Sequence, residues 1–64
     1  MFARDTKVKI GKTRSATIKP GARGRVVWTW PEGHKYRGKY YQVEVGRRNP
    51  KRHILAASVL TEVA

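Results

Sequence analysis

Two stretches of the chain alternate between polar and apolar side chains, which is the period of a half-buried β-strand. Residues 7–10 (KVKI) place a valine and an isoleucine on one face and two lysines on the other. Residues 40–45 (YYQVEV) place Tyr41 and two valines on one face, with Tyr40 and two polar residues opposite. Both stretches therefore predict strands, with Tyr41 in the core and Tyr40 exposed.

The strongest strand signal is the run of β-branched and aromatic residues at 25–30 (RVVWTW). Alternation along this run places Val26, Trp28 and Trp30 on the same face. Because the core of so small a domain has little room for two indole rings, we expect one tryptophan to be largely buried and the other partly exposed. Trp30 is the better candidate for exposure, because Pro31 ends the strand next to it.

Glycine and proline mark the turns between these strands. Pro20-Gly21 is typical of a type II turn, since proline presets φ at the first central position and glycine accepts positive φ at the second. Residues 31–33 (PEG) signal another turn, and Gly46 ends the strand over 40–45. The sequence therefore predicts short strands separated by defined turns.

The C-terminal residues support two interpretations. We favour a short apolar piece followed by one helical turn at 56–58 and a closing strand at 59–63. Alternatively, Asn49 caps a helix with Pro50 at its first position. The cations at 51–53 would then occupy the first turn, where the helix dipole disfavours them by roughly 0.3–1 kcal/mol each. The sequence alone leaves both interpretations open.

The order of these elements resembles that of an SH3-like barrel. Residues 19–27 (KPGARGRVV) are similar to the glycine-bearing turn and valine-rich strand of KOW-type small barrels. The ending at 54–63 is similar to their closing element. The resemblance implies an all-β fold: a single small five-stranded SH3-like barrel with a short helical turn before the last strand. We expect a flexible N-terminus over residues 1–6 and one barrel domain over residues 7–64.

The same resemblance implies two classes of function. KOW-type and related barrels occur in ribosomal proteins, transcription elongation factors and chromatin proteins, where loops and one sheet face bind nucleic acid or protein. Similar barrels also occur as small basic subunits of photosynthetic electron-transfer complexes, which dock acidic ferredoxins. Fold likeness alone does not decide between these classes.

The charge of the chain favours a polyanionic partner. Of its 64 residues, 15 are Lys or Arg and only four are Asp or Glu, which leaves a formal net charge of +11. Solubility alone asks for a net charge of only about 2–8 in a small domain. Nucleic acid is the commonest polyanionic partner of such basic chains. We therefore expect a nucleic-acid-binding protein, for DNA or RNA, that contacts mainly the phosphate backbone and reads little sequence.

Aromatic residues lie between basic ones in the middle of the chain, an arrangement suited to stacking bases and holding phosphates. We expect Tyr36, like Tyr40, to be exposed and able to stack. The predicted nucleic-acid-binding residues are Arg23, Arg25, Trp30, Lys35, Tyr36, Arg37, Lys39, Tyr40, Arg47, Arg48, Lys51 and Arg52.

The composition gives little support to catalysis. The four carboxylates are scattered, the only two histidines lie among cations, and there is no cysteine. We expect no enzyme activity, no catalytic residues, no metal and no cofactor. No apolar run is long enough to span a membrane, so we expect a cytoplasmic protein. The alternative function is a basic subunit or inhibitor that docks on an acidic protein. A third is a structural piece of a ribonucleoprotein assembly.

Overall fold

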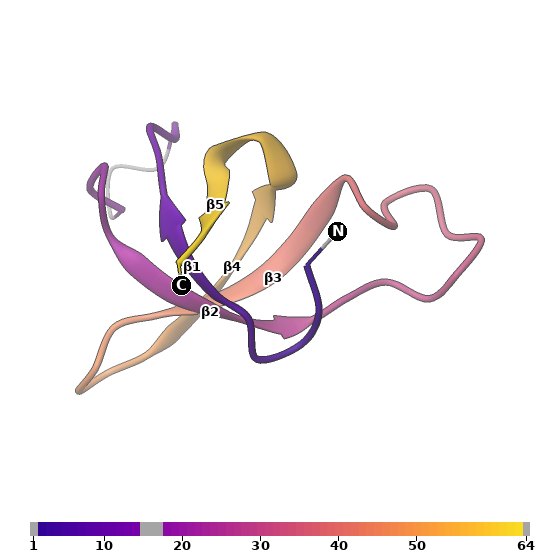
Figure 1. Cartoon of the computed structure of the whole chain (residues 1–64). Coiled ribbons are helices and arrows are strands. Elements are labelled where there is room, and N and C mark those ends of the chain that lie inside the picture. Colours follow the sequence, from indigo (N-terminus) through magenta and orange to yellow (C-terminus); the bar gives the residue numbers. More distant parts are fainter. Residues whose placement is uncertain (1, 15–17, 64) are drawn as a thin grey trace.

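The chain forms one antiparallel β-sheet in the computed structural model, which describes residues 2–14 and 18–63. The sheet has five strands in the order β4-β3-β2-β1-β5 (Figure 1). The elements are β1 (Lys7–Ile10), β2 (Arg23–Trp28), β3 (Tyr40–Val45), β4 (Lys51–Ala56), a 3-10 turn η1 (Ala57–Val59) and β5 (Leu60–Glu62). The all-β prediction and the helical turn before the last strand are confirmed. No ladder among the described residues joins β4 to β5, so the sheet is not closed.

The core lies on one side of the sheet, where the alternating apolar residues meet. The pattern over residues 7–10 and 40–45 predicts the bounds of β1 and β3 as observed. Tyr41 is 1 % exposed, which confirms its place in the core. Its hydroxyl accepts a hydrogen bond from the Phe2 N–H at 3.1 Å, and the two rings pack edge to face. The core consists of Val8, Ile10, Ile18, Val26, Tyr41, Val43, Leu55 and Leu60.

A β-bulge interrupts the alternation of β2. Val26 pairs with Val43, but Trp28 pairs with Gln42, so β2 advances two residues while β3 advances one. The extra residue turns Trp28 to the side of the sheet opposite Val26. Trp28 is consequently 38 % exposed, whereas Trp30 is half-buried and so less exposed than Trp28.

Two expectations about the tryptophans are therefore wrong. Trp28 and Val26 do not share a face, and Trp28 rather than Trp30 is the more exposed of the two. The bulge accounts for both, because it reverses the direction of the side chain at Trp28.

The C-terminal residues have the secondary structure that we favoured from the sequence, with element bounds shifted by one residue. Lys51 begins β4, so the helix capped by Asn49 is wrong. Lys51 and Arg52 are extended in β4, where no helix dipole opposes them. The helical turn lies one residue later than predicted, at Ala57–Val59, and the closing strand begins at Leu60.

Both predicted turns are present. The Ala22 N–H donates to the Lys19 carbonyl at 3.1 Å, and Gly21 has φ of 89° between them. Glycine adopts this left-handed conformation without the strain that a Cβ would bring. The His34 N–H likewise donates to the Pro31 carbonyl at 3.1 Å. These turns set where β2 begins and where the connection to β3 leaves the sheet.

Candidate nucleic-acid interface

The side of the sheet opposite the core, called here the outer face, carries a cluster of cations. Residues between buried ones in a strand point away from the core. Strand pairing sets Lys7 beside Arg25 and Lys9 beside Arg23. The outer-face cations are Lys7, Lys9, Arg23, Arg25 and Arg52, and all of them are exposed. The sheet thereby joins cations that lie up to 45 positions apart in the sequence.

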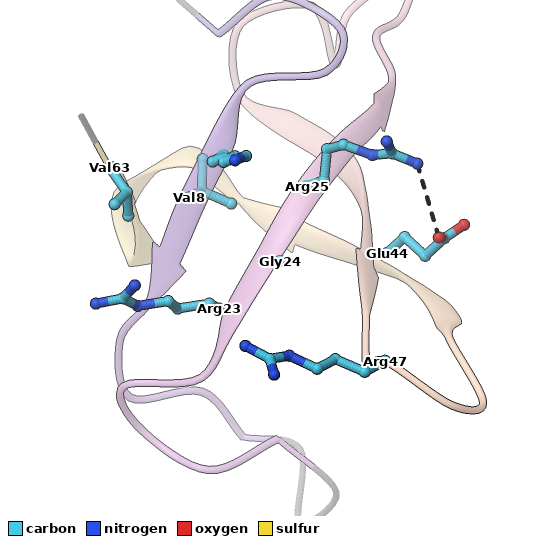
Figure 2. A pocket seen from close by; sticks show the side chains of 9 residues that line it. Val8, Arg23, Gly24, Arg25, Glu44, Arg47 and Val63 are labelled. Atoms are coloured by element: carbon cyan, nitrogen blue, oxygen red, sulfur yellow. Dashed lines mark ion pairs between the residues drawn. The ribbon is translucent and has the colours of Figure 1, made fainter.

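A pocket of about 340 Å³ lies at Gly24, where β1, β2 and β3 run side by side. Gly24 pairs with Val8 on one side and with Val45 on the other. The lining residues are Lys7, Val8, Arg23, Gly24, Arg25, Glu44, Gly46, Arg47 and Val63 (Figure 2). Arg23 and Arg47, from different parts of the chain, therefore lie at one hollow.

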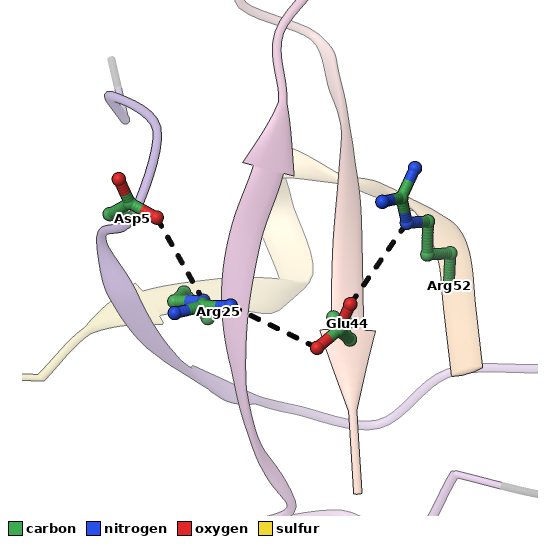
Figure 3. Close-up of polar contacts among 4 residues, drawn as sticks. All are labelled: Asp5, Arg25, Glu44 and Arg52. Carbon is green, nitrogen blue, oxygen red and sulfur yellow. Dashed lines mark ion pairs between the residues drawn. The ribbon is translucent and has the colours of Figure 1, made fainter. Parts of the chain in front are cut away.

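Ion pairs cancel only part of the outer-face charge. Arg25 lies between two carboxylates, with Nε 3.9 Å from Asp5 Oδ1 and Nη2 3.9 Å from Glu44 Oε1 (Figure 3). The other Glu44 oxygen lies 4.0 Å from Arg52 Nε. Such solvent-exposed pairs contribute about 0–1 kcal/mol each. They offset part of the charge of Arg25 and Arg52 but leave the outer face strongly positive.

Apolar side chains also lie on the outer face. Trp28, Gln42 and Ile54 are paired across three strands, and Ile54 is 62 % exposed. The Arg4 guanidinium lies 5.0 Å from the centre of the Trp28 ring, a cation–π distance. Tyr40, the next outer-face residue of β3, is also exposed. Aromatic and aliphatic surface is thus available directly beside cations.

The connection between β2 and β3 carries a cluster of rings: Trp30, His34, Tyr36 and Tyr40. Tyr36 is its centre, with its ring centroid 5.5 Å from that of Trp30 and 5.0 Å from that of Tyr40. Both pairs are edge to face, the arrangement that aromatic quadrupoles favour. Tyr36 and Tyr40 remain exposed, as predicted, so the rings of the cluster contact one another and are still accessible to a ligand.

The three cations of this connection differ in what they contact. Lys35 Nζ lies 5.2 Å from the centre of the Tyr36 ring. Arg37 Nη1 donates to the Trp30 carbonyl at 2.8 Å, which ties the two arms of the connection together. Lys39 contributes its backbone, with its N–H donating to the Tyr36 carbonyl at 2.9 Å and its carbonyl accepting from Ala57 at 2.8 Å. Arg37 therefore stabilises the cluster as well as adding charge.

The predicted site residues do not form one continuous patch. One group, which lies in the connection to β3 or at its end, comprises Trp30, Lys35, Tyr36, Arg37, Lys39 and Tyr40. Arg47, Arg48 and Lys51 lie at the other end of β3. The β2–β3 connection and the β3–β4 connection project from opposite ends of the sheet (Figure 1). A six-residue strand spans about 17–20 Å. The outer face lies between the two groups and holds Arg23, Arg25 and Arg52.

Four residues of this surface are absent from the predicted set: Lys7, Lys9, Trp28 and Ile54. Alternation over residues 7–10 indicates that the lysines face water, but not that they adjoin Arg23 and Arg25. No sequence signal predicts the bulge that exposes Trp28.

Comparison with protein-family models, curated proteins and solved structures finds no match to the chain. In residues 2–14 and 18–63, no group of three or more His, Asp or Glu side chains could hold a metal ion. The helical structure within these ranges includes nothing long and apolar enough to cross a membrane. The arguments for function therefore come from the surface itself.

Proposed function

We propose that this chain binds nucleic acid, DNA or RNA, through its phosphates and with limited sequence preference. The observation that carries the proposal is the outer face, where exposed Trp28 and Ile54 lie among five cations. Within residues 2–14 and 18–63, only Asp5 and Glu44 form ion pairs with these cations. Cations alone would serve solubility. Exposed rings beside cations suit a polymer that offers both phosphates and flat bases.

The phosphate contacts come from Lys and Arg on the outer face and at both ends of β3. Eight of the 15 cations are arginines, whose planar fork suits bidentate contacts with phosphate oxygens. Cations at the two ends of β3 and on the outer face between them offer successive contact points for a backbone. A binding mode of this kind depends on counterion release and reads little sequence.

The base contacts come from exposed side chains on or beside the outer face. Trp28, Tyr36 and Tyr40 each expose more than a third of their surface. Stacking on such rings contributes about 1–3 kcal/mol per base and tolerates any base. Trp30 supports Tyr36 from within the ring cluster.

We also propose that the fold is a variant of the SH3-like barrel, related to KOW-type domains. The strand order β4-β3-β2-β1-β5 and the 3-10 turn before β5 support this relationship. A protein of this class acts where its polymer lies, in the cytoplasm, on a nucleoid or in a ribonucleoprotein particle. The absence of cysteine is compatible with a reducing compartment.

The salt dependence of binding tests the proposal. Fluorescently labelled duplex DNA, single-stranded DNA and RNA of random sequence are titrated with the chain between 50 and 200 mM KCl. Neutralisation of about six phosphates predicts a loss of affinity of roughly a thousandfold over this range. Binding that is tight but flat with salt contradicts phosphate contacts. Tight binding to poly-glutamate without binding to any oligonucleotide would instead favour the acidic-protein alternative.

Replacement of Trp28 tests the stacking contact. Trp28→Ala removes the exposed ring and should weaken binding to single strands by about 1–3 kcal/mol, while Trp28→Phe keeps an aromatic face and most of the affinity. Both variants should fold, because Trp28 lies outside the core. Equal affinity of Trp28→Ala and the unmodified chain would exclude Trp28 from base contacts.

A further inference from the structure

The pocket at Gly24 gathers cations from three parts of the chain. Lys7 comes from β1, Arg23 and Arg25 come from β2, and Arg47 follows β3. Strand pairing fixes where these residues begin, since Lys7 lies opposite Arg25 and Gly24 lies opposite Val45. The sheet therefore holds these cations at one pocket against their mutual repulsion.

The charge of this pocket is only partly compensated. Glu44 is its one lining acid, and it is shared between Arg25 at 3.9 Å and Arg52 at 4.0 Å. Figure 2 shows Arg25 turned toward Glu44. Lys7, Arg23 and Arg47 have no ion pair within residues 2–14 and 18–63. Three like charges around one hollow repel one another, and an anion placed between them would relieve that repulsion.

The size of the pocket narrows the choice of anion. Its volume of about 340 Å³ is roughly eleven times the ~30 Å³ share of one water molecule in the liquid. It lies at the lower end of the range of about 300–1,000 Å³ for small-ligand pockets. A chloride ion would leave most of this open hollow filled with water. Val63 and Gly24, both partly exposed, also line it, so part of the wall suits a carbon skeleton rather than a second charge.

We infer that this pocket binds one phosphate group together with its sugar, with Lys7, Arg23 and Arg47 as the phosphate ligands. The inference deepens the proposed function and rests on it for the source of the phosphate, a nucleic-acid chain. The guanidinium groups of Arg23 and Arg47 donate paired hydrogen bonds to phosphate oxygens. Arg25, already held by two carboxylates, acts as a wall of the pocket.

The experiment compares two double variants that lose the same charge. Arg23→Gln/Arg47→Gln removes two of the three phosphate ligands, and Lys12→Gln/Lys19→Gln removes two exposed lysines that do not line this pocket. Binding of a 12-nucleotide oligothymidylate is measured against salt. We expect the pocket variant to lose about tenfold in affinity and about one unit of salt slope, beyond any change in the control. Melting curves of both variants verify that they fold.

Two further measurements identify the source of the phosphate and keep the two proposals separate. Oligothymidylate with a 5′-phosphate is compared with the 5′-hydroxyl form: tighter binding of the former assigns a terminal phosphate, and equal binding assigns an internal one. Titration of the chain with thymidine monophosphate should shift the amide signals of Gly24 and Gly46 in nuclear magnetic resonance spectra.

Each pattern of results has one meaning. If the unmodified chain binds oligothymidylate but the pocket variant matches the lysine control, the pocket inference is overturned and the proposed function stands. If the chain ignores every oligonucleotide while thymidine monophosphate shifts Gly24, the proposed function fails and the phosphate pocket stands. If neither ligand binds, both fail.

Discussion

At the scale of single residues, Gly24 is a position where the sheet has no room for a side chain. A Cβ built there would lie 2.7 Å from Val43 Cγ1 and 2.8 Å from the Glu44 carbonyl oxygen. The second neighbour is backbone and cannot rotate away, so β2 and β3 would have to separate. Glycine is needed at this position for close approach of the strands, and the same approach shapes the wall of the pocket.

We predict that Gly24→Ala destabilises the chain by about 1–3 kcal/mol, the usual cost of overpacking a tight site. Gly11→Ala is the matched control, because its Cβ would meet only the Val59 carbonyl oxygen at an ordinary 3.5 Å. Urea denaturation followed by tryptophan fluorescence measures both. Equal stability of the two variants would mean that β2 and β3 adjust without cost.

Residue burial was predictable where it follows from alternation alone and unpredictable where it depends on pairing. Val8, Val43 and Tyr41 are buried as their neighbours in sequence indicate. Trp28 is exposed because its partner is Gln42, and that partner is chosen by the register of β3 against β2. Nothing in the run RVVWTW distinguishes a regular strand from a bulged one, since its residues favour either equally.

At the scale of elements, the strands differ in how many neighbours hold them. β1, β2 and β3 are paired on both sides, whereas β4 and β5 form the edges of the sheet. β5 has only three residues, while β4 has six, all in register with β3. The elements at the two edges should therefore differ in local stability.

Native-state hydrogen exchange should rank the strands in this order. We expect β3 and β2 amides to exchange only through global unfolding, and β5 amides to exchange through local opening at a lower free energy. Hydrogen-bonded β4 amides should be intermediate. Protection of β5 equal to that of β3 would show that the sheet opens as one unit, as it would if the edges were joined in solution.

The presence of each strand was easier to predict than its first and last residues. The exceptions are residues 7–10 and 40–45, which alternate and lie between turn residues, so both of their bounds follow from the sequence. The strand predicted at 25–30 instead begins at Arg23 and ends at Trp28. Its start is fixed by pairing of Arg23 with Lys9, and pairing of this kind is a property of the fold rather than of local sequence.

At the scale of the whole molecule, the charge is large compared with the body that carries it. The longest extent of the chain is 32 Å. The Debye length is about 30 Å at 0.01 M salt and about 8 Å at 0.15 M. At low salt every cation therefore repels nearly every other, while at physiological salt only near neighbours interact.

Added salt should accordingly stabilise the free chain. We expect a rise in NaCl from 0.01 to 0.15 M to increase the melting temperature by several degrees, since about 1 kcal/mol corresponds to about 4–8 °C in a domain of this size. Calorimetry measures the change, and choline chloride controls for specific ion effects. The Lys12→Gln/Lys19→Gln variant should respond less. A melting temperature that falls with salt would mean that the exposed ion pairs outweigh the repulsion.

The surplus charge follows from composition alone, but the grouping of the cations does not. Arg23 and Arg47 are 24 positions apart and share a pocket only because Gly24 pairs with Val45. Arg37 and Arg47 are nearer in sequence yet lie at opposite ends of β3. Sequence distance therefore says little about which cations line one pocket.

The outer edge of β4, which pairs with no strand of the described sheet, affects how readily the chain associates with itself. The exposed backbone of this edge strand can pair with the same strand of a second copy, and the exposed Ile54 side chain would add an apolar contact between the two copies. Lys51 and Arg52 on the same strand keep two copies apart while their charge is felt. High salt or a bound polyanion would screen this charge and so remove the repulsion between copies. The salt concentrations that give the free chain its highest melting temperature should therefore also be those at which it precipitates most readily.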